Sequence, residues 1–269
     1  MDILQEIVAF KKKEVEERKS LFPVKLLEKS IYFNSNPVSL KKYLMRDDLT
    51  GIIAEFKRKS PSKGFINKYA DIERTTIGYM QAGASALSVL TDTNFFGGKS
   101  EDLTAARKFN FCPILRKDFT IDEYQITEAK SIGADVILLI AAILTKEQIK
   151  NYTKLANDSG LEVLLEIHGE EELDKIIPEI QIVGINNRNL KTMEISLQNS
   201  INIFSKLPKE AVKVSESGIN KAEQLIELKD AGFKGFLMGE FFMKHSRPEQ
   251  ACMNFIKEVK HLQKQTVNA

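Results

Sequence analysis

The sequence predicts an α/β protein that folds as a closed (β/α)8 TIM barrel with an N-terminal helical extension. Eight short apolar runs, spaced by about 25 residues, alternate with amphipathic stretches typical of helices. Glycine followed by a small residue marks helix exits, as at Gly83-Ala84 and Gly133-Ala134. No glycine-rich dinucleotide fingerprint follows the first strand, which argues against an open nucleotide-binding sheet. Eight such units in 269 residues favour a closed barrel.

The order of elements follows from these patterns. Strands are expected near 51–57, 85–90, 112–117, 134–140, 161–167, 181–186, 211–216 and 234–238. Helices are expected near 71–82, 101–109, 122–132, 145–158, 169–177, 196–206, 219–231 and 247–263. We therefore interpret residues 1–269 as a single barrel domain.

Residues 1–50 precede the barrel and are interpreted as a docked extension. Apolar residues from Ile3 to Val15 fall mostly on one face of a helix that runs to about Arg18. Two further short helices are expected near 24–30 and 40–44. The basic run at residues 11–13 is followed directly by glutamates, which predicts a solvated helix face.

Composition limits the classes of function. A net charge of +2 gives no reason to expect nucleic acid or an anionic membrane as a partner. The longest apolar run, residues 136–144, is too short to cross a bilayer, and the N-terminus does not resemble a signal peptide. The two cysteines, Cys112 and Cys252, form no spaced pair, so we expect neither a disulfide nor a metal site. Together these features favour a cytoplasmic protein.

Charged residues gather at the predicted C-terminal ends of alternate strands. Glu55 and Lys57 end the first strand, Lys117 the third, Glu166 the fifth and Glu216 the seventh. Active sites of this fold lie at that end, and alternate strands contribute to one layer of side chains, so Lys57, Lys117, Glu166 and Glu216 can converge, with Glu55 on the same face as Lys57. Amines and carboxylates in one half-buried pocket shift each other's pKa values, as acid–base catalysis requires. A purely supporting role for Glu55 and Glu216 remains open.

Neighbouring charged residues are assigned to other roles. Arg116 points opposite Lys117 along the strand, toward an outer helix. Asp118 is interpreted as an N-cap or loop residue. His168 is predicted to point away from Glu166.

A second group of residues is suited to binding phosphate. Ser217 and Gly218 follow the seventh strand, Gly239 and Glu240 follow the eighth, and Ser60 lies in the turn after the first. The loops after strands seven and eight often bind phosphate in this fold, and glycine permits close backbone approach. Helix capping alone is the alternative reading.

Aromatic residues in polar loops suggest an apolar slot. Phe95 and Phe96 follow the second strand, and Phe119 follows the third. Together they could form the walls around an aromatic ring, although one of the adjacent pair could equally be ordinary packing.

At this point a family resemblance becomes clear. The chain resembles the indole-3-glycerol phosphate synthases of tryptophan biosynthesis over essentially its whole length. The segments that carry the resemblance are ILQEIVAFKKKEV (3–15), IAEFKRKSPSKG (53–64), LTDTNFFGG (90–98), LRKDF (115–119), LLEI (164–167), GINNRNL (184–190), VSESGI (214–219) and FLMGEFFM (236–243).

The resemblance implies a ring closure that needs no cofactor. The substrate would be 1-(2-carboxyphenylamino)-1-deoxyribulose 5-phosphate, a small phosphorylated molecule that loses carbon dioxide and water. Lys117 matches the family's general acid, Glu166 the carboxylate that assists dehydration, and Lys57 the lysine that contacts the substrate carboxylate. The division of labour between the two lysines is left open.

The remaining site residues are also assigned through the resemblance. Positions that bind hydroxyls or carboxylate and orient the lysines correspond to Glu55, Asn186, Arg188 and Glu216. The phosphate cradle corresponds to Ser60, Gly218, Gly239 and the amide of Glu240, where a small hydroxylated residue is a frequent alternative. The wall of the aryl pocket corresponds to Phe96, Phe119 and Leu138. We expect a monomer, and association with other tryptophan-pathway enzymes stays open.

Two alternative functions fit the sequence less well. Phosphoribosylanthranilate isomerase, another phosphate-binding barrel, typically needs a cysteine and an aspartate at strand ends, whereas Cys112 lies at the start of a strand. A non-catalytic barrel that acts only as a partner would have no need for both lysines and all three glutamates.

Overall fold

In the computed structural model, eight parallel strands close into a barrel in the order β1-β10-β9-β8-β7-β6-β5-β4. The structure describes all residues except 1–2, 190–191, 193 and 268–269, so the last residue of segment 184–190 lies outside the description. The barrel strands are β1 (Ile52–Phe56), β4 (Ala86–Leu90), β5 (Ile114–Lys117), β6 (Val136–Ile140), β7 (Glu162–Ile167), β8 (Ile182–Asn186), β9 (Val212–Glu216) and β10 (Gly235–Met238). The predicted barrel is confirmed, and each strand falls inside its predicted range.

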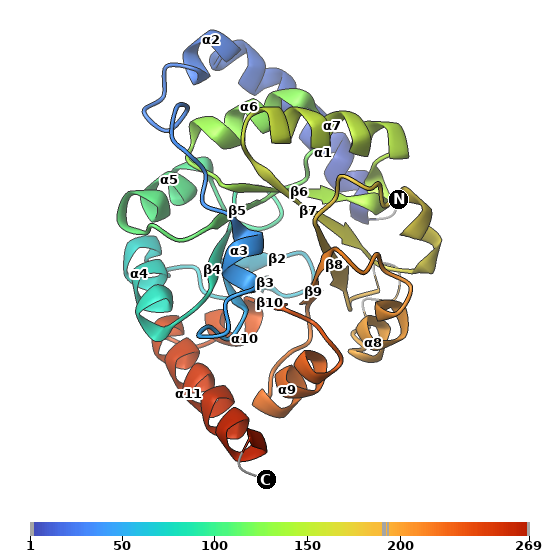
Figure 1. The fold of residues 1–269 in the computed structure, drawn as a ribbon. Coiled ribbons are helices and arrows are strands. Elements are labelled where there is room, and N and C mark those ends of the chain that lie inside the picture. The colour runs from blue at the N-terminus through green and yellow to red at the C-terminus, as the bar shows by residue number, and fades with distance from the viewer. Residues whose placement is uncertain (1–2, 190–191, 193, 268–269) are drawn as a thin grey trace.

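Helices cover the outside of the barrel (Figure 1). They are α4 (Ile72–Ala82), α5 (Ser100–Phe109), α6 (Glu123–Ser131), α7 (Lys146–Asp158), α8 (Gln198–Phe204), α9 (Ala222–Asp230) and α11 (Pro248–Val267). Their boundaries follow local capping. For example, Asp71 caps the start of α4, and Thr145 with Gln148 forms a capping box at the start of α7.

One predicted helix has a different form. The segment 169–177 contains a 3-10 helix, η2 (Glu170–Lys175), instead of an α-helix. Pro178 explains the early end, because a proline disfavours helical backbone at the residue before it. Short elements that the sequence did not predict are the antiparallel strands β2 (Lys59–Ser60) and β3 (Gly64–Phe65), the 3-10 helix η1 (Ala141–Ile143) and α10 (Glu240–Met243).

Alternation along the strands separates two apolar layers. On β1, Ile52, Ala54 and Phe56 pack toward the outer helices, whereas Ile53 belongs to a second cluster inside the barrel. That inner cluster also contains Leu115, Leu164, Val214 and Leu237. On β5, β7 and β9, the charged residues that face the mouth of the barrel, Lys117, Glu166 and Glu216, therefore follow these apolar residues along the strand.

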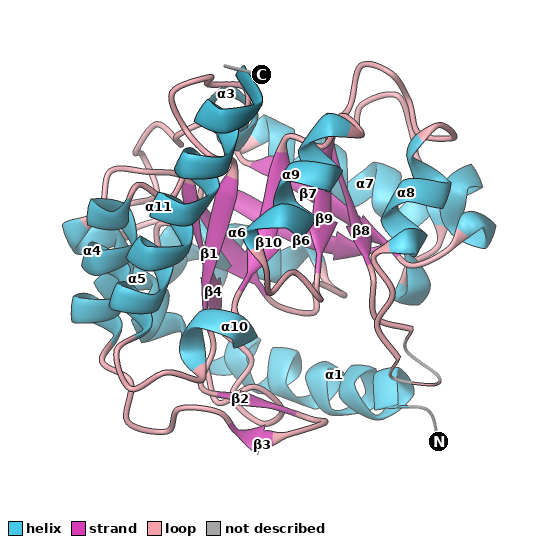
Figure 2. Cartoon of the chain, turned by 90° about the horizontal axis from the view of Figure 1, so that it is seen from below, coloured by secondary structure: helices cyan, strands magenta, loops and turns pink. Residues whose placement is uncertain are grey.

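The N-terminal segment forms α1 (Ile3–Leu21), α2 (Val24–Leu27) and α3 (Leu40–Leu44). Figure 2 shows α1 at the same end of the barrel as β2, β3 and α10. The Tyr124 hydroxyl of α6 donates to the carbonyls of Arg18 and Phe22 near the end of α1, at 3.1 and 2.8 Å. No helix among the described residues is long and apolar enough to cross a membrane.

The prediction of a solvated face at residues 11–13 is wrong for its first member. Lys12 and Lys13 are exposed, but the side chain of Lys11 is only 1% exposed. Its ammonium lies 2.9 Å from each of three carboxylates, those of Glu14, Asp92 and Asp118. The prediction treats residues 11–13 as one exposed group. However, Lys11 shares a helix face with the buried residues Ile7 and Val15.

Candidate active site

A cavity of about 310 Å³ opens at the C-terminal ends of the barrel strands. Apart from Phe95, every residue named above as a candidate catalytic or substrate-binding group lines this cavity. The helix α1 also contributes Ile3, Leu4 and Ile7 to its wall, which the sequence reasoning missed. The wall of the cavity has a charged part, an apolar part and a glycine-containing part.

The centre of the cavity is an ion cluster around Lys117 at the end of β5. Its ammonium donates to Glu166 of β7 at 2.6 Å and to Glu216 of β9 at 2.9 Å. The Asn186 side chain at the end of β8 donates to the other oxygen of Glu166 at 3.3 Å. Residues far apart in sequence thus meet because alternate strands point the same side-chain layer inward. We call Lys117, Glu166 and Glu216 the inner cluster.

Burial and pairing move the pKa values of the two glutamates apart. Burial and the charge of Glu166 raise the pKa of Glu216 to about 7, although Lys117 opposes the shift. For Glu166, burial is outweighed by Lys117 and His168, so its pKa lies well below the usual value. Although burial opposes it, the two carboxylates raise the pKa of Lys117. The inner cluster therefore holds a cationic amine, an ionised carboxylate and a carboxyl group that titrates near neutrality.

Glu55 and Lys57 form a second ion pair on the same inner face, with 2.7 Å between the Lys57 ammonium and a Glu55 oxygen. Glu55 is buried, and the Ser88 hydroxyl lies 3.4 Å from its other oxygen. Gly239 makes room for this carboxylate, because a Cβ atom there would overlap Glu55. Gly184 does the same for Glu216 from β8.

His168 lies beside Glu166, so the prediction that it points away is wrong. Its Nε2 is 3.2 Å from a Glu166 oxygen, and its Nδ1 is 3.6 Å from Glu172 of η2. Residues two apart share a face at the end of a strand, which the earlier reading overlooked. Burial disfavours the charged ring, but the two carboxylates outweigh it and raise the pKa of His168 to about 9.

The apolar wall of the cavity is formed by Phe96, Phe119 and Leu138. The Phe96 and Phe119 rings lie 5.9 Å apart between centroids and are tilted by 37°. Leu138 is buried on β6. Phe95, the other member of the adjacent pair, is buried in the inner apolar cluster and meets Phe10 of α1 edge to face at 5.8 Å. Only one of the two neighbouring phenylalanines therefore lines the cavity.

The glycine-containing side of the cavity is built from three turns. Ser217 has a positive φ of 68°, which turns the chain sharply after β9, and Gly218 follows it. The Ser60 hydroxyl is buried and has no hydrogen-bond partner among the described residues. The Glu240 carboxylate pairs with Lys63 and lies 3.7 Å from Arg188. Glu240 is thus tied across the mouth of the cavity by two basic residues.

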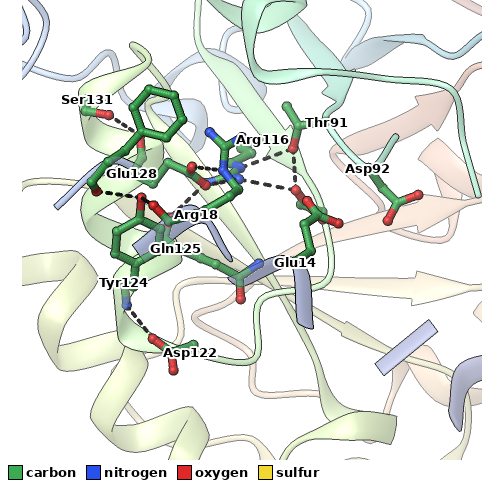
Figure 3. Close-up of polar contacts among 12 residues, drawn as sticks. Glu14, Arg18, Thr91, Asp92, Arg116, Asp122, Tyr124, Gln125, Glu128 and Ser131 are labelled. Carbon is green, nitrogen blue, oxygen red and sulfur yellow. Dashed lines mark hydrogen bonds and ion pairs between the residues drawn. The ribbon is translucent and has the colours of Figure 1, made fainter. Parts of the chain in front are cut away.

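A second charged group lies on the opposite, outer face of β5. Arg116 meets α6 as predicted, since its guanidinium pairs with Glu128 and donates to the Gln125 carbonyl. Asp118 lies just after the strand, but it is buried and ion-paired to Lys11 and Arg116. We define the outer cluster as Lys11, Arg18, Asp92, Arg116, Asp118 and Glu128. Figure 3 labels Arg18, Asp92, Arg116 and Glu128 of this cluster.

A closed parallel barrel with an acid–base cluster and an anion-suited turn at its catalytic end defines a phosphate-binding barrel enzyme. Comparison with known proteins gives the particular family. The family model for indole-3-glycerol phosphate synthase matches residues 4–255. The chain therefore belongs to the indole-3-glycerol phosphate synthase family.

Relatives with this name align over nearly their full length. An indole-3-glycerol phosphate synthase of Bacteroides thetaiotaomicron is 48% identical over 96% of this chain and 99% of its own. One of Caldanaerobacter subterraneus subsp. tengcongensis is 41% identical over the same shares. Among solved structures, the tryptophan synthase a2b2 complex of Pyrococcus furiosus matches with a TM-score of 0.59 and 15% identity, over 79% of this chain and 98% of that one. At this identity the match shows the fold alone.

Proposed function

We propose that this chain converts 1-(2-carboxyphenylamino)-1-deoxyribulose 5-phosphate into indole-3-glycerol phosphate, carbon dioxide and water. The observation that carries the proposal is the position of Lys117. Its ammonium is held between two carboxylates, in a cavity with an aryl-sized apolar wall and a phosphate-suited turn. Membership of the family supports the same reaction.

Lys117 is the proposed general acid for ring closure. As the ring carbon that bears the carboxylate attacks the ketone carbon, the carbonyl oxygen gains charge and takes a proton from the Lys117 ammonium. Glu166 and Glu216 keep this amine protonated in the free enzyme and fix its direction. A positioned acid of this kind typically contributes 10²–10⁴-fold, on the order of 3–5 kcal/mol of barrier.

Decarboxylation and dehydration complete the indole. The bond to the carboxylate breaks, carbon dioxide leaves, and its electron pair restores the aromatic ring. The hydroxyl then departs as water with a proton from a lysine ammonium, while Glu166 accepts the proton lost from the substrate. Glu166 can accept this proton because it is ionised in the free enzyme, where Lys117 and His168 hold its pKa well below the usual value.

The remaining residues are proposed to bind and orient the substrate. Lys57 contacts the substrate carboxylate and is itself oriented by Glu55 at 2.7 Å. Asn186 and Arg188 bind hydroxyls and carboxylate.

The two ends of the substrate have separate sites. Phe96, Phe119 and Leu138 enclose the aryl ring. The phosphate is cradled by Ser60, Ser217, Gly218, Gly239 and the amide of Glu240, where the unpaired Ser60 hydroxyl offers a donor.

The finer assignments are part of the same proposal. The enzyme is a carbon–carbon lyase made of a single domain, and it acts in the cytoplasm as a monomer. Association with other tryptophan-pathway enzymes is compatible with this reading.

The alternatives have less support. Burial raises the pKa values of both Cys112 and Cys252 to about 12, and neither lines the described cavity. A cysteine-dependent isomerisation therefore has no thiolate to use. A non-catalytic barrel would retain several buried charges at a cost and without a use.

The test is direct. Purified protein given the carboxyphenylamino-ribulose phosphate should produce indole fluorescence in the absence of metal and nucleotide. A folded protein that binds this compound without turning it over would contradict the proposal.

A further inference from the structure

Lys11 is a buried cation that the proposed reaction does not use, and its side chain is only 1% exposed. It lies on α1, and its neighbours Lys12 and Lys13 are exposed. Burying an ammonium costs several kcal/mol unless partners compensate for lost water, and an apolar residue of similar size often serves packing equally well. Three carboxylates at 2.9 Å therefore indicate a specific role for the charge beyond filling space.

Two of these carboxylates hold the backbone of the loops that form the aryl wall. After β4, one Asp92 oxygen accepts from the amides of Phe95 and Phe96, at 2.7 and 3.2 Å, and the other faces Lys11. After β5, Asp118 accepts from the Phe119 amide at 2.8 Å. Each aspartate thus joins a loop backbone to the same ammonium.

The two loops are also hydrogen-bonded to each other. The Thr91 hydroxyl donates to Asp118 at 2.6 Å, and the Thr91 amide donates to the Lys117 carbonyl at 3.2 Å. Figure 3 shows Thr91, Asp92 and Glu14 on one side of Arg116, with Glu128 and Tyr124 on the other. The loops that carry Asp92 and Asp118 are therefore joined both by these hydrogen bonds and by their ion pairs to Lys11.

The helix that carries Lys11 is itself held at a second point. Arg18 lies two helical turns after Lys11 on α1, and its guanidinium pairs with Glu128 of α6. Because Arg18 and Lys11 lie on the same side of the helix, α1 is fixed against both α6 and the two loops. The position of the Lys11 ammonium is therefore set by the docking of α1 at both points.

We propose that Lys11 is a positioning residue for the aryl end of the substrate: through Asp92 and Asp118 it sets the spacing of the loops that carry Phe96 and Phe119. This inference rests on the proposed function, since that assigns the aryl ring to this wall. Lys117 has its own partners in the inner cluster, so Lys11 governs binding of the ring more than proton transfer.

The test compares Lys11→Met with Lys12→Met, a matched change at the next, exposed position. Lys11→Met should raise KM about 10–100-fold with kcat within about threefold, because misplacing a binding wall by ~1 Å has effects of this size. Lys12→Met should leave both constants within about twofold.

A rescue variant separates positioning from general stability. In Lys11→Met/Asp92→Asn, the new amide can still accept from the Phe95 and Phe96 amides while its NH2 group faces Asp118. We expect KM of this double variant to return most of the way to the value of the unsubstituted protein. A role in stability alone would leave KM unchanged in every variant that folds.

Two inhibitors distinguish the ends of the cavity. In Lys11→Met, inhibition by 2-aminobenzoate should weaken in parallel with KM, while inhibition by inorganic phosphate should stay as in the unsubstituted protein. An unchanged KM in folded Lys11→Met, or equal weakening toward both inhibitors, would overturn the inference.

Two further results keep the inference separate from folding and from the proposed function. If Lys11→Met does not fold, Asp92→Asn alone should raise KM about threefold, and an unchanged KM would then overturn it. Absence of turnover by the unsubstituted protein would reject the proposed function. If the unsubstituted protein is active and Lys11→Met has an unchanged KM, only the role of Lys11 is rejected.

Discussion

Two charged clusters lie back to back across β5, and they use similar residues in different ways. The inner cluster, around Lys117, opens onto a cavity, and one oxygen of Glu216 has no hydrogen-bond partner among the described residues. In the outer cluster, Lys11, Arg116 and Asp118 are buried and face one another and the backbone. Similar chemistry thus produces an available group on one face and a fixed frame on the other.

The two clusters also differ in where they titrate. Partners of opposite charge outweigh burial in the outer cluster, so the pKa values of Lys11 and Arg116 are raised and that of Asp118 is lowered. Inside, the pKa of Glu216 is about 7, and that of neighbouring His168 is about 9. Ion pairing thus moves the pKa values of Lys117 and Glu166 away from neutrality as it does in the outer cluster, whereas Glu216 titrates near neutral pH because it is buried beside Glu166.

The largest effect is expected from the inner cluster. Lys117→Ala should lower kcat/KM by about 10³-fold or more, because the proposed acid is lost and two carboxylates are left facing each other. Indole fluorescence measures the rate, with Lys12→Ala as the exposed control. Binding of indole-3-glycerol phosphate should stay within about tenfold. If binding is lost together with turnover, Lys117 belongs to recognition of the substrate.

At Arg116, the outer cluster should respond in stability and not in kcat. Arg116→Met removes a buried cation from between Glu128 and Asp118, so the free energy of unfolding should fall by about 3–5 kcal/mol although Arg18 and Lys11 still pair with these carboxylates. Denaturant unfolding measures this change, and the exposed Arg46→Met is the control. Turnover by the folded fraction should stay within about threefold. A large loss of turnover with unchanged stability would remove the distinction between the clusters.

A smaller effect should appear only as pH changes. The pKa of His168 is raised from 6.5 to about 9, so its stabilising contribution is complete below pH 6.5 and is lost as pH rises through about 9. Replacing it in His168→Gln should therefore lower the free energy of unfolding by about 1–3 kcal/mol at pH 6.5, and by much less above pH 9. The exposed His261→Gln should leave the pH dependence unchanged. If the free energy of unfolding of His168→Gln and of the unsubstituted protein change with pH in parallel, the His168 ring is neutral in the folded protein.

Much of this arrangement could be predicted from strand alternation. Alternation along β5 placed Arg116 outward and Lys117 inward, and the closed barrel brought alternate strand ends together. The same rule, applied correctly, places His168 beside Glu166. These predictions succeed because the period of a strand fixes the side-chain direction whatever the distant partner is.

The role of Lys11 was harder to foresee. Its position between Ile7 and Val15 on one helix face gives a signal for burial, but a lysine in a basic run is usually solvated. The carboxylates it meets, Asp92 and Asp118, lie more than 80 residues away in the sequence. Pairing of this kind depends on how a preceding helix docks, which local periodicity does not specify.

The space beside Gly184 and Gly239 has a consequence for changing the substrate range of this protein. A methyl group at either position would overlap Glu216 or Glu55, so the floor of the cavity cannot be remodelled there without displacing a carboxylate. Phe96, Phe119 and Leu138 carry no such constraint. Variants that accept larger or smaller rings should therefore be sought by substituting these three residues. Such substitutions leave the geometry of the inner cluster unchanged.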